Sequence, residues 1–317
     1  MNATALREHR FELVEIGEEF GPREVLVDAA RVKAFAFAQD DYRPWHFGPS
    51  PFGGPVAHAS LLANELMQIY FERFRIDVHE HSEPGGAWLE EAHVEETLRF
   101  EAPLPVGETA TLRGRFVEKY VVAGRGAVVL EGEAVGPDGQ VVLSHRAIEY
   151  FRMDGPLPED GRREPPLRRV EPAAGGTPAE RADRGLPAGT PIPTLRKRVT
   201  FPQLLVYSTL DHPAARRSIH TDYEIAARAG LSAPLVQGQQ LICHVAEAMT
   251  SFFGERWLTA GEVRAKFLGA VVAGETVEVG GAVRGLASDG SEERLELDAW
   301  VLRDGVPVAV ANASCPV

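Results

Sequence analysis

Residues 100–117 read FEAPLPVGETATLRGRFV, and residues 267–284 read FLGAVVAGETVEVGGAVR. In each stretch a Gly-Glu-Thr triplet, beginning at Gly107 and at Gly274, precedes a run of alternating residues. A second pair of matches, an Asp-Gly dipeptide in each half, follows in the same order and at nearly the same separation. Two ordered matches at one spacing indicate an internal duplication rather than a chance recurrence of turn motifs.

The two halves share one pattern of secondary structure signals. A long apolar stretch, Val56–Phe74 in the first half and Leu235–Phe253 in the second, predicts a buried helix, because it is apolar on nearly all sides. Strands at Val128–Val135 and Leu295–Leu302 then lead into the Asp-Gly turns typical of antiparallel hairpins. The sequence therefore predicts an α+β fold in which one central helix wrapped by an antiparallel sheet occurs twice, with the two sheets joined edge to edge.

A proline-rich stretch separates the halves. Residues 155–194 hold nine of the 23 prolines of the chain, and proline removes backbone donors and fixes φ. We expect a semi-extended surface linker there. The predicted organisation is an N-terminal domain over 1–154, a linker over 155–194 and a C-terminal domain over 195–317.

Composition and charge exclude several classes of function. The 317 residues carry a formal charge of -13, which disfavours binding to nucleic acid or to anionic membranes. No apolar run approaches the length of a membrane helix, and the charged start has no signal-peptide core. The two cysteines, Cys243 and Cys315, match no metal or redox spacing, which favours a reducing, cytoplasmic compartment.

The sharpest local motif lies in the second half, where residues 220–238 read HTDYEIAARAGLSAPLVQG. Asp222 is placed to cap a short helix, and Gly230 is placed to end it. Gly238 falls in the first turn of the long helix, where a glycine lets a ligand approach backbone N–H groups at the positive end of the helix dipole. A carbonyl that gains negative charge would be stabilised there, with His220 in the loop beside it.

This motif resembles the MaoC-like acyl dehydratases, also called (R)-specific enoyl-CoA hydratases. The resemblance rests on His-x-Asp at His220, on the Ala, Gly, Pro and Gly that follow, and on KFLGAVVAGETVEVGGAV. It covers the second half well and the first half weakly. It implies two tandem hot-dog domains, a hydro-lyase that adds water to an enoyl thioester or removes it from a 3-hydroxyacyl thioester, and no dissociable cofactor.

The family's catalytic pattern is Asp-x-Asn-Pro-x-His, in which the acid and the histidine hold one water. The first half reads Asp41-Tyr-Arg43-Pro-Trp-His46, so that Asp41 and His46 match while an arginine replaces the asparagine. The segment that follows His46 is shorter than in the family and lacks the His-x-Asp. The first half therefore has the complete acid–histidine pair, but the residues around the pair match the family less well than those of the second half.

The second half departs from the pattern in the opposite way. It keeps His220 and everything after it, but Ala215 stands where the aspartate is expected, and Asp211 is the nearest upstream carboxylate. Two alternatives follow: Asp41 and His46 are the working pair, or His220 works with an acid from elsewhere.

Three further residues enter the prediction through the alignment of the two helix starts. Gln237 and Gly238 are candidates to bind the thioester, and His58, which aligns with Gln237, either lines the other site or is simply buried. Asp222 is interpreted as a helix cap and not as a catalyst. His79, His81 and His93 lie in one charged segment, but no shared helix face supports a metal, and we predict none.

Two rivals remain for the function. A hot-dog thioesterase would need a carboxylate on a long helix, for which Glu65 and Glu247 are candidates. A non-catalytic acyl-thioester binding protein is favoured by Ala215. The expected partner is an acyl-CoA or acyl-carrier-protein thioester, with no nucleic acid and no membrane, and a homodimer of the chain is one possible assembly.

Overall fold

The computed structural model describes residues 7–71, 74–75, 91–159, 161, 165–172, 175–210, 217–288 and 292–317. The described part of the first half contains two α-helices, two short 3₁₀ helices and seven strands. In chain order its elements are β1 (Arg7–Glu8), η1 (Phe11–Leu13), β2 (Glu19–Leu26), α1 (Ala29–Gln39), η2 (Pro44–His46), α2 (Ala63–Phe71), β3 (Phe74–Arg75), β4 (His93–Phe100), β5 (Thr109–Val122), β6 (Arg125–Val135) and β7 (Val141–Phe151).

From β2 onward, the described elements of the second half follow a similar order, but α6 follows the central helix where the first half has β3. They are β8 (Leu195–Arg198), α3 (Phe201–Thr209), α4 (Tyr223–Arg228), α5 (Gly238–Phe253), η5 (Gly254–Arg256), α6 (Trp257–Ala260), β9 (Glu262–Phe267), β10 (Thr276–Ser288), β11 (Glu293–Arg303) and β12 (Val306–Pro316).

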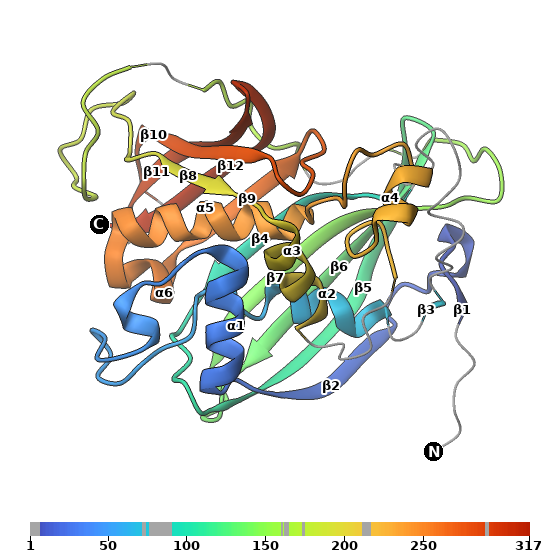
Figure 1. Cartoon of the computed structure of the whole chain (residues 1–317), viewed down its shortest axis with the longest axis horizontal. Helices are drawn as coiled ribbons and strands as arrows, with labels where there is room; N and C mark the ends of the chain where they lie inside the picture. The colour runs from blue at the N-terminus through green and yellow to red at the C-terminus, as the bar shows by residue number, and fades with distance from the viewer. Residues whose placement is uncertain are drawn as a thin grey trace.

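Ten strands form one continuous sheet in the order β2-β5-β6-β7-β4-β9-β12-β11-β10-β8 (Figure 1). The order reads the same from both ends if β2 is matched with β8, β5 with β10, β6 with β11, β7 with β12 and β4 with β9. The halves meet where β4 pairs antiparallel with β9, and Thr97 lies opposite Arg264. This pairing covers two strand edges that would otherwise be exposed, and it confirms the predicted joining of two like sheets.

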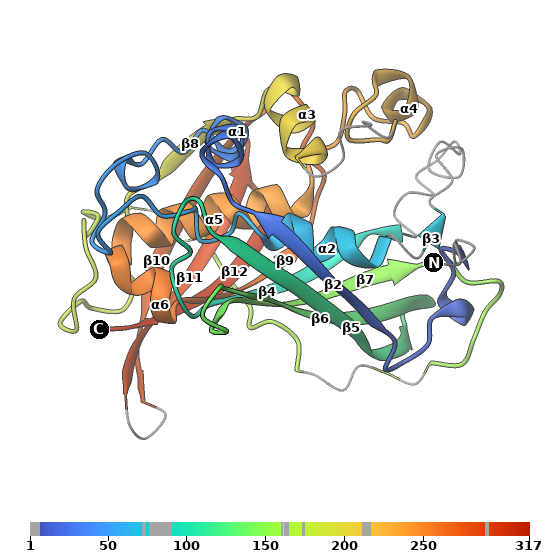
Figure 2. The same ribbon diagram turned by 90° about the horizontal axis from the view of Figure 1, so that it is seen from below.

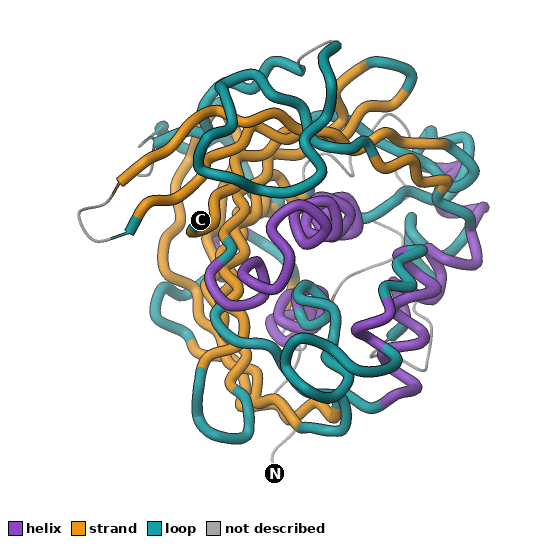
Figure 3. The backbone as a smooth tube through the Cα atoms, turned by 90° about the vertical axis from the view of Figure 1, so that its left-hand side faces the viewer, coloured by secondary structure: helices purple, strands orange, loops and turns teal. Residues whose placement is uncertain are grey.

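The sheet curves around the central helices (Figure 3). Helix α5 is almost entirely buried, and it ends at Gly254, whose φ of 68° suits a glycine at a helix C-terminus. Helix α2 is also buried and lies beside the strands of the first half (Figure 2). Both helices therefore serve as the core of their halves, as the apolar stretches predicted.

The predicted first helix, Val56–Phe74, is wrong at both ends. Helix α2 has only nine residues, against 16 in α5. Its start is delayed because Val56 forms a β-bridge with Pro105 and residues 59–62 form turns, with the Leu61 N–H donating to the His58 carbonyl. Its end comes early because Phe74–Arg75 pairs in parallel with Arg7–Glu8. The first half thus has the shorter central helix.

The predicted hairpins are present. Asp304 and Gly305 have φ values of 50° and 77° between β11 and β12, the left-handed pair that a tight type I′ turn needs. Gly139 has a φ of 78° in the turn between β6 and β7. In the described parts of 155–194 there is no helix or strand, and Pro191 forms an isolated bridge to Ala282.

Candidate functional site

The two helix starts occupy equivalent positions in the two halves. The Ala57 N–H donates to the Leu104 carbonyl at 2.8 Å, and the Val236 N–H donates to the Val271 carbonyl at 2.8 Å. A histidine closes each arrangement: Nδ1 of His46 is 2.8 Å from the Val56 carbonyl oxygen, and Nδ1 of His220 is 2.7 Å from that of Leu235. His46 and His220 are therefore equivalent residues. A neutral His220 ring that donates through Nδ1 has its lone pair on Nε2.

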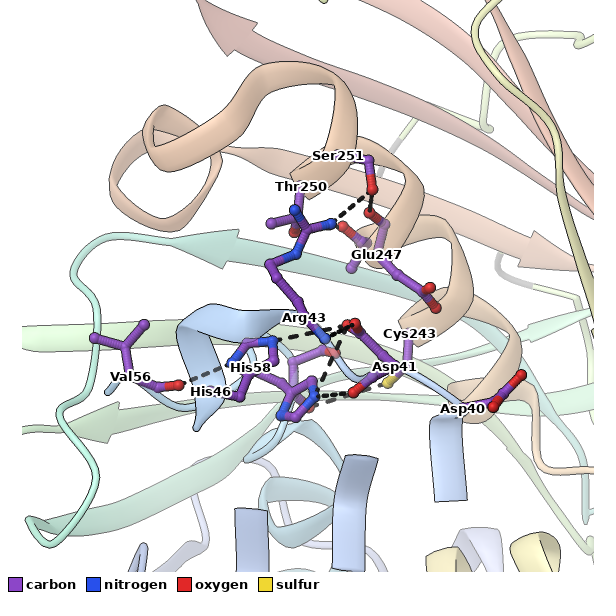
Figure 4. Close-up of polar contacts among 12 residues, drawn as sticks. Asp40, Asp41, Arg43, His46, Val56, His58, Cys243, Glu247, Thr250 and Ser251 are labelled. Carbon is purple, nitrogen blue, oxygen red and sulfur yellow. Dashed lines mark hydrogen bonds and ion pairs between the residues drawn. The ribbon is translucent and has the colours of Figure 1, made fainter. Parts of the chain in front are cut away.

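In the first half, three side chains gather at this position (Figure 4). Nε2 of His46 and Nε2 of His58 each lie 3.8 Å from Oδ2 of Asp41, and the two imidazole rings stack with their centroids 3.5 Å apart. Nε2 of His58 also contacts the Asp41 backbone oxygen at 3.0 Å. Asp41 and His46, five residues apart on the loop that contains η2, are thus brought together, and His58 joins them.

Burial and neighbouring charges shift the pKa values of Asp41 and His58. Burial alone would raise the pKa of Asp41, but His46, His58 and Arg43 outweigh it and hold the pKa of that carboxyl well below its usual range. Burial, together with repulsion from His46, lowers the pKa of His58 to about 4. At neutral pH Asp41 is therefore a carboxylate, and His58 is a neutral imidazole.

Little space is left beside the trio. The cavity there measures about 10 Å³, at the lower limit of the space that one water needs. Its other walls come from both halves: the first half contributes Phe35, Gln39, Ala59 and Ser60, and the second half contributes Cys243, Ala246, Glu247 and Thr250 of α5 and Leu258 of α6. Arg43, which replaces the asparagine of the family pattern, donates to Oγ of Ser251 at 2.6 Å and so fastens the loop to α5. The acid–histidine pair is therefore largely buried and has little free space beside it.

Asp41, His46 and His58 also have the spacing of metal ligands, since their ligand atoms lie within 4.8 Å of one another. Their orientation does not suit a shared ion. The lone pairs of an imidazole lie in the ring plane, and these two rings are stacked at 22°. The lone pairs therefore run side by side instead of converging on one point.

The second half has the opposite character. A cavity of about 400 Å³, within the size range of small-molecule sites, opens beside His220 and the start of α5. The sequence candidates on its wall are His220, Gln237 and Gly238. The first half contributes Met67, Gln68 and Phe71 of α2 together with His9, Glu91, Ala92, His93, Val94, Arg125, Glu149 and Tyr150. The short helix α2 lines this large cavity, whereas the long helix α5 lines the small cavity beside Asp41 and His46.

The start of α5 is where the sequence predicts that a carbonyl gaining negative charge would be stabilised. Gln237 precedes the helix in an extended conformation, and its Nε2 donates to Oγ of Ser208 at 3.1 Å. The N–H groups of the first helical turn lie at its positive end, where that of Gln240 donates to the Gln237 carbonyl at 3.0 Å.

The role expected of Gly238 needs a correction. A Cβ at this position would lie 2.9 Å from the ring of Phe267, so the glycine makes room for that aromatic side chain. The Cα surface is therefore covered by Phe267.

A valine at position 238 should accordingly destabilise the fold, beyond its small effect on helix propensity. We expect Gly238→Val to cost about 1–3 kcal/mol of unfolding free energy through overpacking against Phe267. Chemical denaturation would measure this loss. Gly269→Ala is the control, because a Cβ there meets Val308 at an ordinary 3.5 Å. Equal stability of Gly238→Val and the wild type would contradict the packing account.

The other candidate residues from the sequence either cap a helix or form ion pairs. Oδ1 of Asp222 accepts from the N–H groups of Glu224 and Ile225 at the start of α4, and its Oδ2 contacts Arg217 at 2.6 Å. Glu65 is fully buried against Arg31, and Glu247 pairs with Lys197 at 2.8 Å. Both thioesterase candidates are thus engaged in ion pairs. Ala215, Asp211, His79 and His81 lie outside the described residues.

Sequence reasoning missed the polar wall that the first half contributes to the cavity. His93 and Glu149 are direct partners in the β4–β7 pairing, and both line the cavity. Burial raises the pKa of Glu149 to about 8, with a further contribution from Glu96 and Glu91. The only signal in the sequence was the cluster of histidines and acids before β4, which had no evident connection with the second half.

The raised pKa of Glu149 predicts a pH-dependent stability. Between pH about 4.5 and 8 the folded chain holds a proton on Glu149 that the unfolded chain has lost, so this group destabilises the fold as pH rises through that window. Glu149→Gln should remove the effect, and its stability relative to the wild type should rise with pH by at most about 1.4 kcal/mol per unit. Urea denaturation at pH 5, 6.5 and 8 would measure it, and a difference that does not change with pH would refute it.

Comparison with known proteins gives a result for structure only. Neither the family models nor the curated proteins include a match to this sequence. Among solved structures, a MaoC-like dehydratase superposes with a TM-score of 0.72 at 18% identity, covering 96% of this chain and 99% of its own. A Mycobacterium tuberculosis protein described as having a double hotdog fold gives 0.67 at 16% identity, covering 98% of both chains.

The chain has the double hot-dog fold. A third structure with this architecture is the peroxisomal multifunctional enzyme type 2 of Drosophila melanogaster, with a TM-score of 0.61 at 16% identity over 94% of this chain and 48% of that one. The double hot dog predicted from the duplication is confirmed by these likenesses. Within the described residues no helix is both long enough and apolar enough to span a membrane.

Proposed function

We propose that the protein adds water to an enoyl thioester, or removes it from a 3-hydroxyacyl thioester, in the cavity of its second half. The single observation that carries the proposal is that His220, Gln237 and the start of α5 share one cavity of about 400 Å³. Support also comes from the names of the structural neighbours, two of which are called MaoC-like dehydratases. The carrier is coenzyme A or an acyl carrier protein.

The chemistry follows from the two parts of the site. Nε2 of His220 accepts a proton from water, and the oxygen adds to Cβ of the enoyl group. The π electrons move onto the thioester oxygen, where the N–H groups of the first turn of α5 stabilise the enolate charge. The imidazolium then gives its proton to Cα, so that one water is consumed and one C–O and one C–H bond form. In the reverse direction the same groups remove water.

Hydration of a panel of enoyl-CoA thioesters tests this proposal. We expect the enoyl absorbance to fall as 3-hydroxyacyl-CoA forms, with no release of free coenzyme A in a thiol assay. Release of coenzyme A would favour a thioesterase instead. Binding of the thioesters without either reaction would favour an acyl-thioester binding protein.

A further inference from the structure

The cavity wall contributed by the first half carries a histidine close to the proposed thioester position. The ring of His93, at the start of β4, meets the ring of Phe267 edge-on with centroids 5.0 Å apart. Phe267 lies against Cα of Gly238, the first residue of α5. His93 therefore approaches the start of α5 across a single aromatic ring, although it comes from the other half of the chain.

The ring of His93 is held in one orientation and one tautomer. Its Nε2 donates to the Glu95 carbonyl at 3.1 Å and lies 3.9 Å from Oε2 of Glu96. A neutral ring that donates through Nε2 has its lone pair on Nδ1. Burial lowers the pKa of His93 against the opposing pull of Glu96, so the ring is neutral at neutral pH. Nδ1 has no hydrogen-bond partner among the described residues.

A buried carboxylate connects His93 to the start of α5. The side chain of Glu96 is fully buried, and it receives a hydrogen bond of 3.0 Å from Nε2 of Gln239 in the first turn of that helix. Nε2 of His145 lies 3.1 Å from the same carboxylate. The histidine on the wall and the start of α5 thus contact the same carboxyl group.

We propose that His93 is the second catalytic group of the second-half site and acts on the same water as His220. The inference rests on the proposed function, and it supplies the group that Ala215 cannot provide. Water donates one hydrogen bond to Nε2 of His220 and one to Nδ1 of His93. His220 takes the first proton and delivers it to Cα, while His93 holds the second hydrogen and aims the oxygen at Cβ.

The test compares His93→Gln with a matched control. Loss of a group that orients and polarises the water should lower kcat for enoyl-CoA hydration about 100-fold or more, with little change in KM. His145→Gln is the control, because His145 contacts the same Glu96 carboxylate but does not line the cavity. It should change kcat by less than about tenfold. A kcat of His93→Gln close to that of the wild type would overturn the inference.

A pH profile of the wild-type protein keeps the inference testable if His93→Gln fails to fold. Two imidazoles must be neutral for activity, so log kcat/KM should fall towards low pH with a slope approaching 2. The charged or titratable groups around His93 are Glu95, Glu96, Glu149 and His145. A slope of 1, or a full loss of activity in Asp211→Asn with His93→Gln unaffected, would assign the second role elsewhere. A wild-type protein that hydrates no enoyl thioester would instead refute the proposed function itself.

Discussion

His220→Gln should lower kcat/KM for enoyl-CoA hydration by about 10²–10⁴, the range expected for loss of a general acid–base group. The reason is geometric: His220 lines the cavity of about 400 Å³, with its proton held on Nδ1 by the Leu235 carbonyl. The glutamine keeps a polar side chain at the position but cannot accept a proton. Stopped-flow or steady-state hydration assays with an enoyl-CoA substrate would measure the change.

His46→Gln is the matched control, because His46 holds the equivalent position in the first half. We expect its activity to stay within about tenfold of the wild type, since that site has only about 10 Å³ of free space. Its stability should fall instead, because the buried carboxylate of Asp41 loses a partner. A large loss of activity in His46→Gln with little loss in His220→Gln would place the reaction at Asp41 and His46.

The second large effect concerns stability. Nη1 of Arg31, on α1, contacts Oε1 of Glu65 at 2.6 Å, and the Glu65 side chain is fully buried at the core of the first half. Arg31→Met should cost about 3–5 kcal/mol of unfolding free energy, because it leaves a buried charge without its cation. Denaturant titration would measure the loss.

The paired change Arg31→Met with Glu65→Met separates the charge effect from packing. It should recover most of the stability, since replacing both members of a buried ion pair by apolar residues is often neutral. An unchanged stability of Arg31→Met alone would show that Glu65 does not depend on this contact. A double variant no more stable than the single one would show that the loss comes from packing.

The fold could be predicted because its signals are local and occur twice. Alternating residues, Asp-Gly turns and an apolar stretch recur in both halves, and β6, α5 and β11 lie where these patterns predicted. The ends of α2 could not be predicted. They depend on pairing with segments distant in sequence, such as the bridge between Val56 and Pro105 and the pairing of Phe74 with Arg7.

The site was predicted less completely, for a related reason. Both members of the pair Asp41 and His46 are visible in the sequence, but nothing in the sequence shows that residues of α5 and α6 line the small space beside them. His93 was visible only as a member of a charged segment. Its place in the cavity depends on the antiparallel contact between β4 and β9, which brings the two halves together.

A crystal structure of the His220→Gln variant with an enoyl-CoA bound tests the central claim most directly. The account predicts the acyl group in the second-half cavity, with the thioester oxygen about 3 Å from N–H groups of the first turn of α5. Cβ should face His93 and residue 220. An acyl group bound beside Asp41 and His46, with the second-half cavity empty, would contradict it.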